Sequence, residues 1–246
     1  MASKCLRELI AEADERGLAA SGLACLERCL PLLSSEAGAL RPLWAGLARG
    51  AESWPGSLAV AREAMADSED SEAVRMEVGG RTGTVKDQKA GYGDGTVRDQ
   101  RAGRGDGTVR GQGAGRGHGT VRAAASSLVR QMLDAAPAVW AAGPLREWAD
   151  DCSVAALELH HRFDAGPGGG EPEAADVVEV LKGCREGEPP AGAGPLVTGE
   201  LRRQLRVLEI LAAGDGGSGL RQVLTVSTEG QRVLRAVVSR RARVQS

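Results

Sequence analysis

Three near-identical glycine-rich units interrupt a chain that otherwise has the pattern of packed helices. The units are GTVKDQKAGYGD, GTVRDQRAGRGD and GTVRGQGAGRGH, and a fourth start, GTVR, follows at Gly119. Each unit contributes one Val and one Ala, so stacked units would bury almost no apolar surface. Their glycines also raise the entropic cost of ordering the segment. We therefore expect a disordered Gly-rich insertion over residues 76–122.

The two flanks of the repeat continue one amphipathic pattern. Before it the chain has the sequence SEDSEAVR, and after it the segment from Val121 to Leu133 has apolar residues at helical spacing. Deleting residues 76–122 joins the flanks into SEDSEAVRAAASSLVRQMLDAAP, a single amphipathic helix. The pattern predicts that the repeat was inserted into, or just before, a helix of an all-α protein.

The composition also favours helices. Hydrophobic residues make up 42% of the chain but aromatic residues only 2%, so the core must consist of Leu, Val and Ala. Such side chains suit closely packed helices better than a β-sandwich, which uses β-branched and aromatic strands. The formal net charge of −2 argues against a chain-wide electrostatic attraction to nucleic acid or to an anionic membrane.

Cysteine usage and hydropathy predict the compartment. The five cysteines are an odd number and lie mostly on apolar helical faces, which favours free thiols in a reducing environment. The N-terminal sequence is charged throughout and lacks the apolar region of a secretory signal. No run approaches the roughly 18 apolar residues of a membrane span. We expect a soluble protein of the cytoplasm or the nucleus, with no membrane partner.

Apolar spacing, with Pro and Gly at the boundaries, predicts a series of helices. Gly17 and Gly50 are expected to end helices, and Pro42 implies either a kink or a later helix start. Thr198 is expected to cap a helix, and Thr228 with Gln231 forms a predicted capping box. The expected organisation is helical repeats at 1–75, the insertion at 76–122, helical repeats at 123–186, a linker at 187–197 and C-terminal helices with a basic tail at 198–246.

Two segments resemble HEAT and armadillo-type helical repeats. These are LERCLPLLSSEAGALRPLWAGLARG and the joined EDSEAVRAAASSLVRQML. The resemblance implies stacked antiparallel helix pairs that bind a partner protein along a groove. In addition, DDCSVAALELHHRF and the Gly/Pro-rich loop after it are similar to the C-terminal part of HEAT-repeat activators of the ATM kinase. That similarity implies a role in genome maintenance or DNA-damage signalling.

Two groups of residues are candidates for chemistry. Cys25 and Cys29 are four residues apart and could face one metal ion, but a CxxC knuckle is absent and buried core thiols explain them better. His160 or His161 could act as a general base, although no nucleophile motif accompanies them and a half-buried helix end is the simpler interpretation. Neither phosphate-binding glycine motif is present. We expect no enzyme activity, no cofactor and no metal.

Three further features concern partners. From Gly83 to Arg122 the chain has eight Lys or Arg and four Asp, a net charge of +4, which favours a passive spacer over an RNA-binding segment. Arg240, Arg241 and Arg243 form either a nucleic-acid or nuclear-localisation patch or a set of cations favoured at a helix C-terminus. The tryptophans either fill space between helices or contact a partner; they are Trp44, Trp54, Trp140 and Trp148.

Taken together, these features predict a non-enzymatic scaffold or adaptor built from helical repeats, with unidentified protein partners. The alternative is a nucleic-acid-associated protein that uses the Arg/Gly repeat and the basic C-terminal tail. The low net charge makes nucleic acid the less expected primary partner.

Overall fold

The all-α prediction is confirmed by the computed structural model, in which the regular elements of the described residues are helical. The structure describes residues 4–33, 38–66, 114–164, 174–187, 193–214 and 217–244. The elements are α1 (Leu6–Glu12), α2 (Glu15–Cys29), η1 (Leu30–Leu32), α3 (Arg41–Arg49), η2 (Ala51–Ser53), a helix over residues 54–66, α5 (Ala114–Asp134), α6 (Ala142–Asp164), α7 (Ala174–Arg185), α8 (Pro195–Ala213) and α9 (Gly217–Val244).

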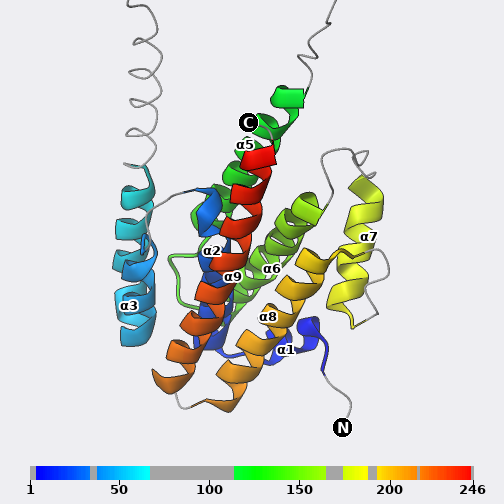
Figure 1. The fold of residues 1–246 in the computed structure, drawn as a ribbon. Helices are drawn as coiled ribbons and strands as arrows, with labels where there is room; N and C mark the ends of the chain where they lie inside the picture. Colours follow the sequence, from blue (N-terminus) through cyan, green and yellow to red (C-terminus); the bar gives the residue numbers. More distant parts are fainter. Residues whose placement is uncertain are drawn as a thin grey trace, which may run out of the picture.

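The helix α2 is central to the fold. Its residues from Gly17 to Cys29 are all buried, and α6, α8 and α9 pack against it (Figure 1). The close approach of α6 depends on Gly22, because a Cβ atom at this position would lie 2.7 Å from the Trp148 ring. A helix that is buried on all sides has no face for solvated groups, so its polar side chains need partners inside the protein.

The helices α3 and 54–66 form an antiparallel pair at one side of the bundle (Figure 1). Pro42 lies in the first turn of α3, where its missing N–H costs no intrahelical hydrogen bond. Of the two alternatives for Pro42, the structure therefore shows the later helix start. Gly50 ends α3 as predicted, with a φ of 106° that favours glycine.

The predicted end of the first helix at Gly17 is wrong. The helix α1 ends at Glu12, and Asp14 caps α2 by accepting a hydrogen bond of 2.7 Å from the backbone N–H of Gly17. Gly17 thus lies in the first turn of a buried helix. The aspartate three residues before it is the stronger boundary signal, because its carboxylate satisfies a free N–H group at the helix start.

The predicted cap at Thr198 is also wrong. The helix α8 begins at Pro195, so residues 195–197 of the predicted linker are helical. Its first N–H groups are satisfied by Asp164, at the end of α6, whose carboxylate accepts hydrogen bonds from Leu196 (3.0 Å) and Val197 (2.9 Å). This cap comes from a residue distant in sequence, which a local pattern cannot reveal.

The predicted capping box of Thr228 and Gln231 does not form. Both residues lie inside the continuous helix α9. The Thr228 hydroxyl instead donates a hydrogen bond of 2.8 Å to the backbone carbonyl of Leu224, one turn earlier.

Most of the predicted insertion lies outside the described residues. This applies to residues 76–113 and also to 71–75, the first part of the helix that the repeat is predicted to interrupt. The helix α5 begins at Ala114, so the last part of the predicted insertion, 114–122, is helical in the structure. The joining of the two flanks into one helix stays a prediction.

One hydrophobic core contains buried side chains from the predicted segments 1–75, 123–186 and 198–246. Leu and Ala dominate it, with Val, Cys and Trp in smaller numbers, in keeping with the composition. Within the part of the chain that the structure describes, no helix is both long enough and apolar enough to span a lipid bilayer.

Candidate interaction site

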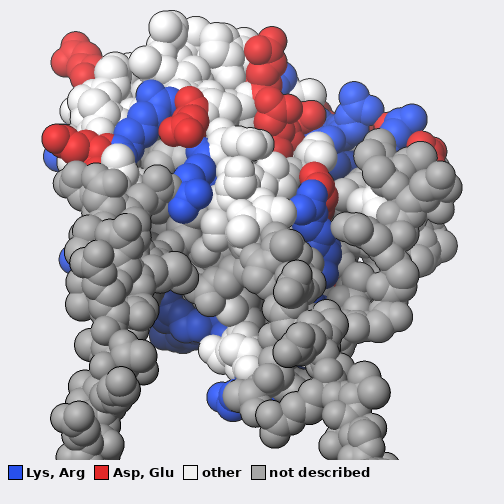
Figure 2. Space-filling model, turned by 90° about the horizontal axis from the view of Figure 1, so that it is seen from above, with Lys and Arg blue, Asp and Glu red and all other residues white. Residues whose placement is uncertain are grey.

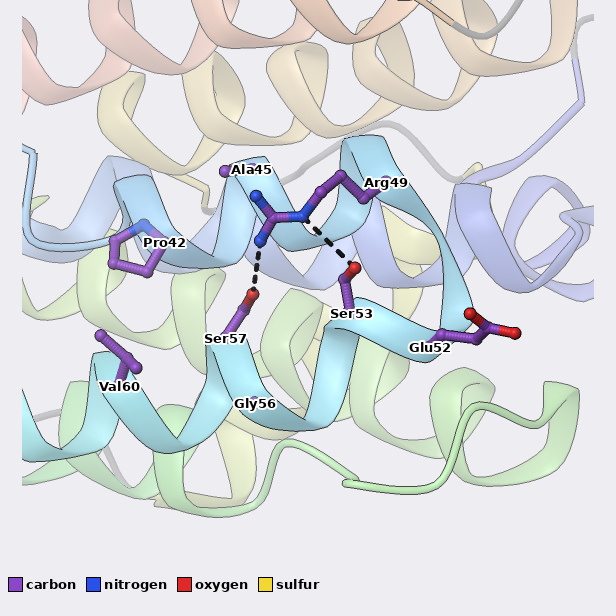
Figure 3. Close-up of a pocket in the computed structure, with 8 residues that line it drawn as sticks. All are labelled: Pro42, Ala45, Arg49, Glu52, Ser53, Gly56, Ser57 and Val60. Carbon is purple, nitrogen blue, oxygen red and sulfur yellow. Dashed lines mark hydrogen bonds between the residues drawn. The ribbon is translucent and has the colours of Figure 1, made fainter.

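An open groove runs between α3 and the helix over residues 54–66 (Figure 3). Its volume is about 530 Å³. Apolar and small side chains line most of it, with one cation, one carboxylate and two hydroxyls; the lining residues are Pro42, Ala45, Arg49, Glu52, Ser53, Gly56, Ser57 and Val60. Val60 has 51% of its surface exposed, whereas the other large apolar side chains of its helix, Trp54, Leu58 and Met65, are buried.

Arg49 is the central polar group of the groove. Its Nε donates to the Ser53 hydroxyl at 3.3 Å, and its Nη2 donates to the Ser57 hydroxyl at 3.4 Å. These bonds hold the guanidinium across the space between the two helices (Figure 3). Glu52 lies at the end of the groove opposite to Val60, so the carboxylate does not neutralise the centre. The groove therefore combines an apolar wall with a positioned positive charge.

Gly46 sets the spacing of the two helices beside the groove. A Cβ atom on Gly46 would lie 2.6 Å from the Ser57 Cβ and 3.2 Å from the backbone oxygen of Ser53. The helices therefore approach each other closely at this point. The groove lies beside this contact and keeps its width because the contact has no room for a larger residue.

Tryptophans attach the helix over residues 54–66 to the bundle. Trp54 donates from Nε1 to the Pro137 carbonyl at 2.7 Å. Its ring makes edge contacts with Trp140 at a centroid distance of 5.6 Å and with Trp148 at 5.9 Å. Trp148 also donates to the Met132 carbonyl at the end of α5 (2.7 Å). This cluster fixes one wall of the groove relative to α5 and α6.

Arg62 makes a second attachment of the same helix. Its Nη2 donates to the backbone carbonyls of Asp134 (2.6 Å) and Ala136 (2.8 Å) and lies 3.3 Å from that of Leu133. These carbonyls are at the end of α5, where intrahelical partners are lacking and a cation is favoured.

Glu27 attaches the other wall of the groove, α3, to the centre of the bundle. Its buried carboxyl accepts hydrogen bonds from Trp44 Nε1 (3.0 Å) and Gln231 Nε2 (2.7 Å). It thus connects α2, α3 and α9. Burial raises the pKa of Glu27, while the two hydrogen bonds lower it by less.

The predicted partner-binding role of the tryptophans is limited by this placement. Trp44, Trp54 and Trp148 are buried, so in this structure they fill space between helices, which is the first of the two interpretations given for them. Trp140 is half-buried and packs against the core. The sequence patterns did not indicate the groove residues. The signals that could have indicated them are the glycine at the helix–helix contact, Gly46, and an apolar residue, Val60, outside the buried stripe.

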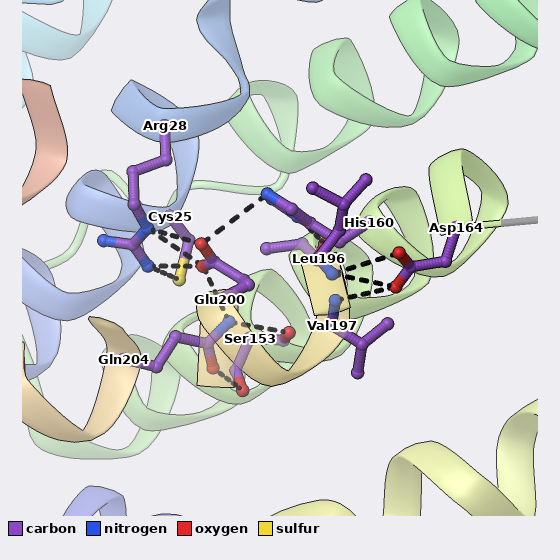
Figure 4. Close-up of polar contacts among 10 residues, drawn as sticks. Cys25, Arg28, Ser153, His160, Asp164, Leu196, Val197, Glu200 and Gln204 are labelled. Carbon is purple, nitrogen blue, oxygen red and sulfur yellow. Dashed lines mark hydrogen bonds and ion pairs between the residues drawn. The ribbon is translucent and has the colours of Figure 1, made fainter. Parts of the chain in front are cut away.

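A second polar cluster lies deep in the bundle between α2, α6 and α8 (Figure 4). Arg28 and Glu200 form its centre, and the side chains of both are fully buried. Gln204 donates to Glu200 (3.0 Å), and Ser153 donates to Gln204 (2.7 Å). His160 Nε2 lies 3.8 Å from Glu200, and its Nδ1 is 2.7 Å from the Ala156 carbonyl. The cluster pairs the Arg28 charge that α2 carries into the core, while Arg28 Nη1 and His160 Nε2 make no hydrogen bond within the described residues.

The chemistry of this cluster favours structure over reactivity. Burial raises the pKa of Cys25 to about 12, although the nearby Arg28 lowers it, and burial also raises the pKa of Cys29 well above its usual value. Both thiols are therefore protonated at neutral pH and are weak nucleophiles. Among the described residues, no three His, Cys, Asp or Glu side chains are grouped as a metal site would need. His161, next to the buried His160, is half-buried.

The basic tail residues lie at the end of α9. Arg240 and Arg243 are exposed. Arg241 lies over the Phe163 ring, 5.3 Å from its centroid, and donates to the Phe163 carbonyl at the end of α6. The structure thus separates the three arginines by role, because Arg241 holds α9 to α6 while the other two face solvent.

No protein-family profile, no curated protein and no solved structure matches the chain.

Proposed function

We propose that the protein is a non-enzymatic interaction scaffold that binds a partner segment in the groove between α3 and the helix over residues 54–66. The observation that carries the proposal is that the positioned Arg49 and the exposed Val60 line one open groove, whose two walls are both attached to the core. Rigidly held walls reduce the entropic cost of binding, and ligand sites typically combine an apolar lining with a few precisely placed polar groups.

The occupant that fits this groove is a partner segment with an apolar side chain next to Asp or Glu. The apolar side chain would cover Val60 and Pro42, which otherwise remain in contact with water. The carboxylate would bind the Arg49 guanidinium, whose planar donor groups suit a carboxylate. The small side chains at Ala45 and Gly56 leave space for the backbone of the segment, since a Cβ atom at Gly56 would meet no atom within 4 Å.

A random-peptide library displayed on phage tests the proposal. The library is selected on the full-length protein and then counter-selected on a Val60→Arg variant. We expect enriched peptides that pair an apolar residue with Asp or Glu, and that lose at least about tenfold in affinity for Val60→Arg, which corresponds to 1.4 kcal/mol. Val139→Arg is the matched control, because Val139 is also exposed, at 65%, and lies outside the groove.

Two results would contradict the proposal. One is that selection enriches no peptide above the background of uncoated beads. The other is that the enriched peptides bind the Val60→Arg and Val139→Arg variants equally, which would place the binding surface elsewhere.

The role in DNA-damage signalling rests on resemblance alone, whereas one structural feature bears on the repeat-array arrangement. The antiparallel pair of α3 and 54–66 supports an αα-hairpin unit of the HEAT or armadillo kind. However, α9 packs on α2, which joins distant parts of the chain. In a strictly linear array each repeat contacts only its neighbours. We therefore propose a compact bundle that carries at least one repeat-like hairpin as its binding element.

A further inference from the structure

The C-terminal part of α9 is much more basic than the rest of the protein. Seen from above, basic and acidic side chains are interspersed over the described surface (Figure 2), and the net charge of the whole chain is only −2. From Gly230 to Ser246, however, the chain has five arginines and no Asp or Glu. Four of these arginines are exposed on α9 and can meet a ligand; they are Arg232, Arg235, Arg240 and Arg243.

The four exposed arginines share one face of α9. At 3.6 residues per turn they fall within an arc of about 140° around the helix axis, whereas Arg241 falls outside it. Arg241 is the one that stacks on Phe163 and binds its carbonyl. From Arg232 to Arg243 the face extends over roughly 16 Å of helix. In the described part of the chain, no carboxylate lies within ion-pair distance of Arg232, Arg235 or Arg240.

The apolar residues of the same helix segment distinguish between two anionic surfaces. Leu234 is buried, and Val237 and Val238 pack against the hydrophobic core. An interfacial membrane helix needs an apolar face that can enter the lipid. Here that face is already used by the bundle, so the remaining surface offers arginine donors without insertable side chains. This favours a phosphate backbone over a lipid surface.

We propose that this arginine face of α9, defined by Arg232, Arg235, Arg240 and Arg243, binds the phosphate backbone of duplex nucleic acid without reading its sequence. Guanidinium groups bind phosphate oxygens with paired hydrogen bonds. Arginines along a straight helix can contact successive phosphates of one strand, and they release condensed counterions as they do so. The contact of Arg241 with Phe163 holds the end of α9 to α6 and keeps the face in place. This inference does not depend on the groove at α3.

Salt-dependent binding of the full-length protein to a fluorescein-labelled DNA duplex of about 20 base pairs tests the proposal. The slope of log K against log salt becomes shallower by about 0.9 for each phosphate that the protein no longer neutralises. The test variant is Arg240→Gln/Arg243→Gln. The matched control is Arg202→Gln/Arg206→Gln, which removes the same charge from exposed positions on α8. Any binding by residues 67–113 is common to both variants, so it cancels in the comparison.

We expect the α9 variant to bind on the order of tenfold more weakly, with a slope shallower by about 1.8, and the α8 control to stay close to wild type. Equal effects in both variants would overturn the proposal, since they would reflect net charge alone. Absence of duplex binding by the wild-type protein would also overturn it. So would binding to phosphatidylserine vesicles in preference to the duplex, because that result would assign the face to a membrane surface.

Discussion

Arg28 and Glu200 form a fully buried ion pair between α2 and α8, although they are 172 residues apart in sequence. Arg28 Nε lies 2.9 Å from both carboxylate oxygens, and Nη2 lies 2.7 Å from Oε1. Burial by itself raises the pKa of Glu200, but the charge of Arg28, with smaller contributions from His160 and from hydrogen bonds, lowers it overall. The carboxyl is therefore ionised, and α2 and α8 are joined by two charges that have no access to water.

Removing one partner of this pair should destabilise the protein strongly. We expect Glu200→Met to lower the free energy of unfolding by about 3–5 kcal/mol, because it leaves the Arg28 charge buried without a partner. The double variant Arg28→Met/Glu200→Met should recover most of this loss, since apolar side chains of similar length can fill the space. Urea denaturation of the two single variants and the double variant measures the effect. Additive losses would show that the pair is not coupled.

Glu27 should make the stability depend on pH in the opposite sense to a salt-bridged acid. Burial raises its pKa in the folded protein above the unfolded value near 4.5. Its stabilising contribution is therefore complete below the unfolded pKa and is lost as the pH rises through the folded pKa. In Glu27→Gln that loss is absent, so the stability of the variant relative to wild type should increase between pH 4.5 and neutral pH. Denaturation at a series of pH values tests this.

The Gln side chain also presents an amide NH₂ to one of the two donors, Trp44 or Gln231, which lowers stability by an amount independent of pH. The expected effect is therefore a change with pH in the stability difference between Glu27→Gln and wild type, whatever the size of that difference at any one pH. A constant difference between Glu27→Gln and wild type over this range would contradict a raised pKa for Glu27.

Gly46→Ala should widen the contact between the walls of the groove. Alanine normally stabilises a helix by about 1 kcal/mol relative to glycine. Here the new methyl group would meet Ser57, and the repacking should outweigh that gain and cost about 1–3 kcal/mol. Gly143→Ala is the control, because a Cβ there meets no atom within 4 Å and it should be neutral or stabilising. The melting temperatures of both variants, measured by thermal unfolding, test this prediction. Equal melting temperatures would contradict the close packing at Gly46.

The cysteines should differ sharply in reactivity. Cys5 is half-exposed, whereas Cys25, Cys29, Cys152 and Cys184 are buried. Burial raises the pKa of all four buried thiols. We expect iodoacetamide at pH 8 to modify Cys5 in the folded protein and the other thiols only after unfolding, as mass spectrometry of the digested protein would show. Rapid modification of Cys25 in the folded state would show that α2 is accessible to solvent.

The local features of this fold were predictable where the signal lies within one helix. Apolar spacing predicts the helices, Pro42 allows a late start of α3, and Gly50 ends it. Cys25 and Cys29 lie in the core, as their position on an apolar face indicates. In each case the residue acts on its own backbone or on the nearest face.

The tertiary features were not predictable, because their partners are distant in sequence. Gln231 follows Thr228 at the spacing of a capping box, yet its amide binds Glu27, 204 residues away. Asp164, at the end of α6, caps α8 although α7 lies between them in the sequence, so the local candidate Thr198 is not needed. The groove arises from two helices whose exposed sides each look unremarkable alone. Its charge, Arg49, becomes a candidate only when Ser53 and Ser57 are seen to hold it.

A charge exchange at Arg49 tests the proposed binding site most directly. Fluorescence polarisation would measure the affinity of two peptides for the wild-type protein and for Arg49→Glu. One is an enriched acidic peptide, and the other is the same peptide with its Asp or Glu changed to Lys. We predict that the acidic peptide loses at least about tenfold in affinity for Arg49→Glu and that the Lys peptide regains most of it. If Arg49→Glu weakens both peptides equally, or neither, the peptide carboxylate does not bind Arg49 and the groove is not the interaction site.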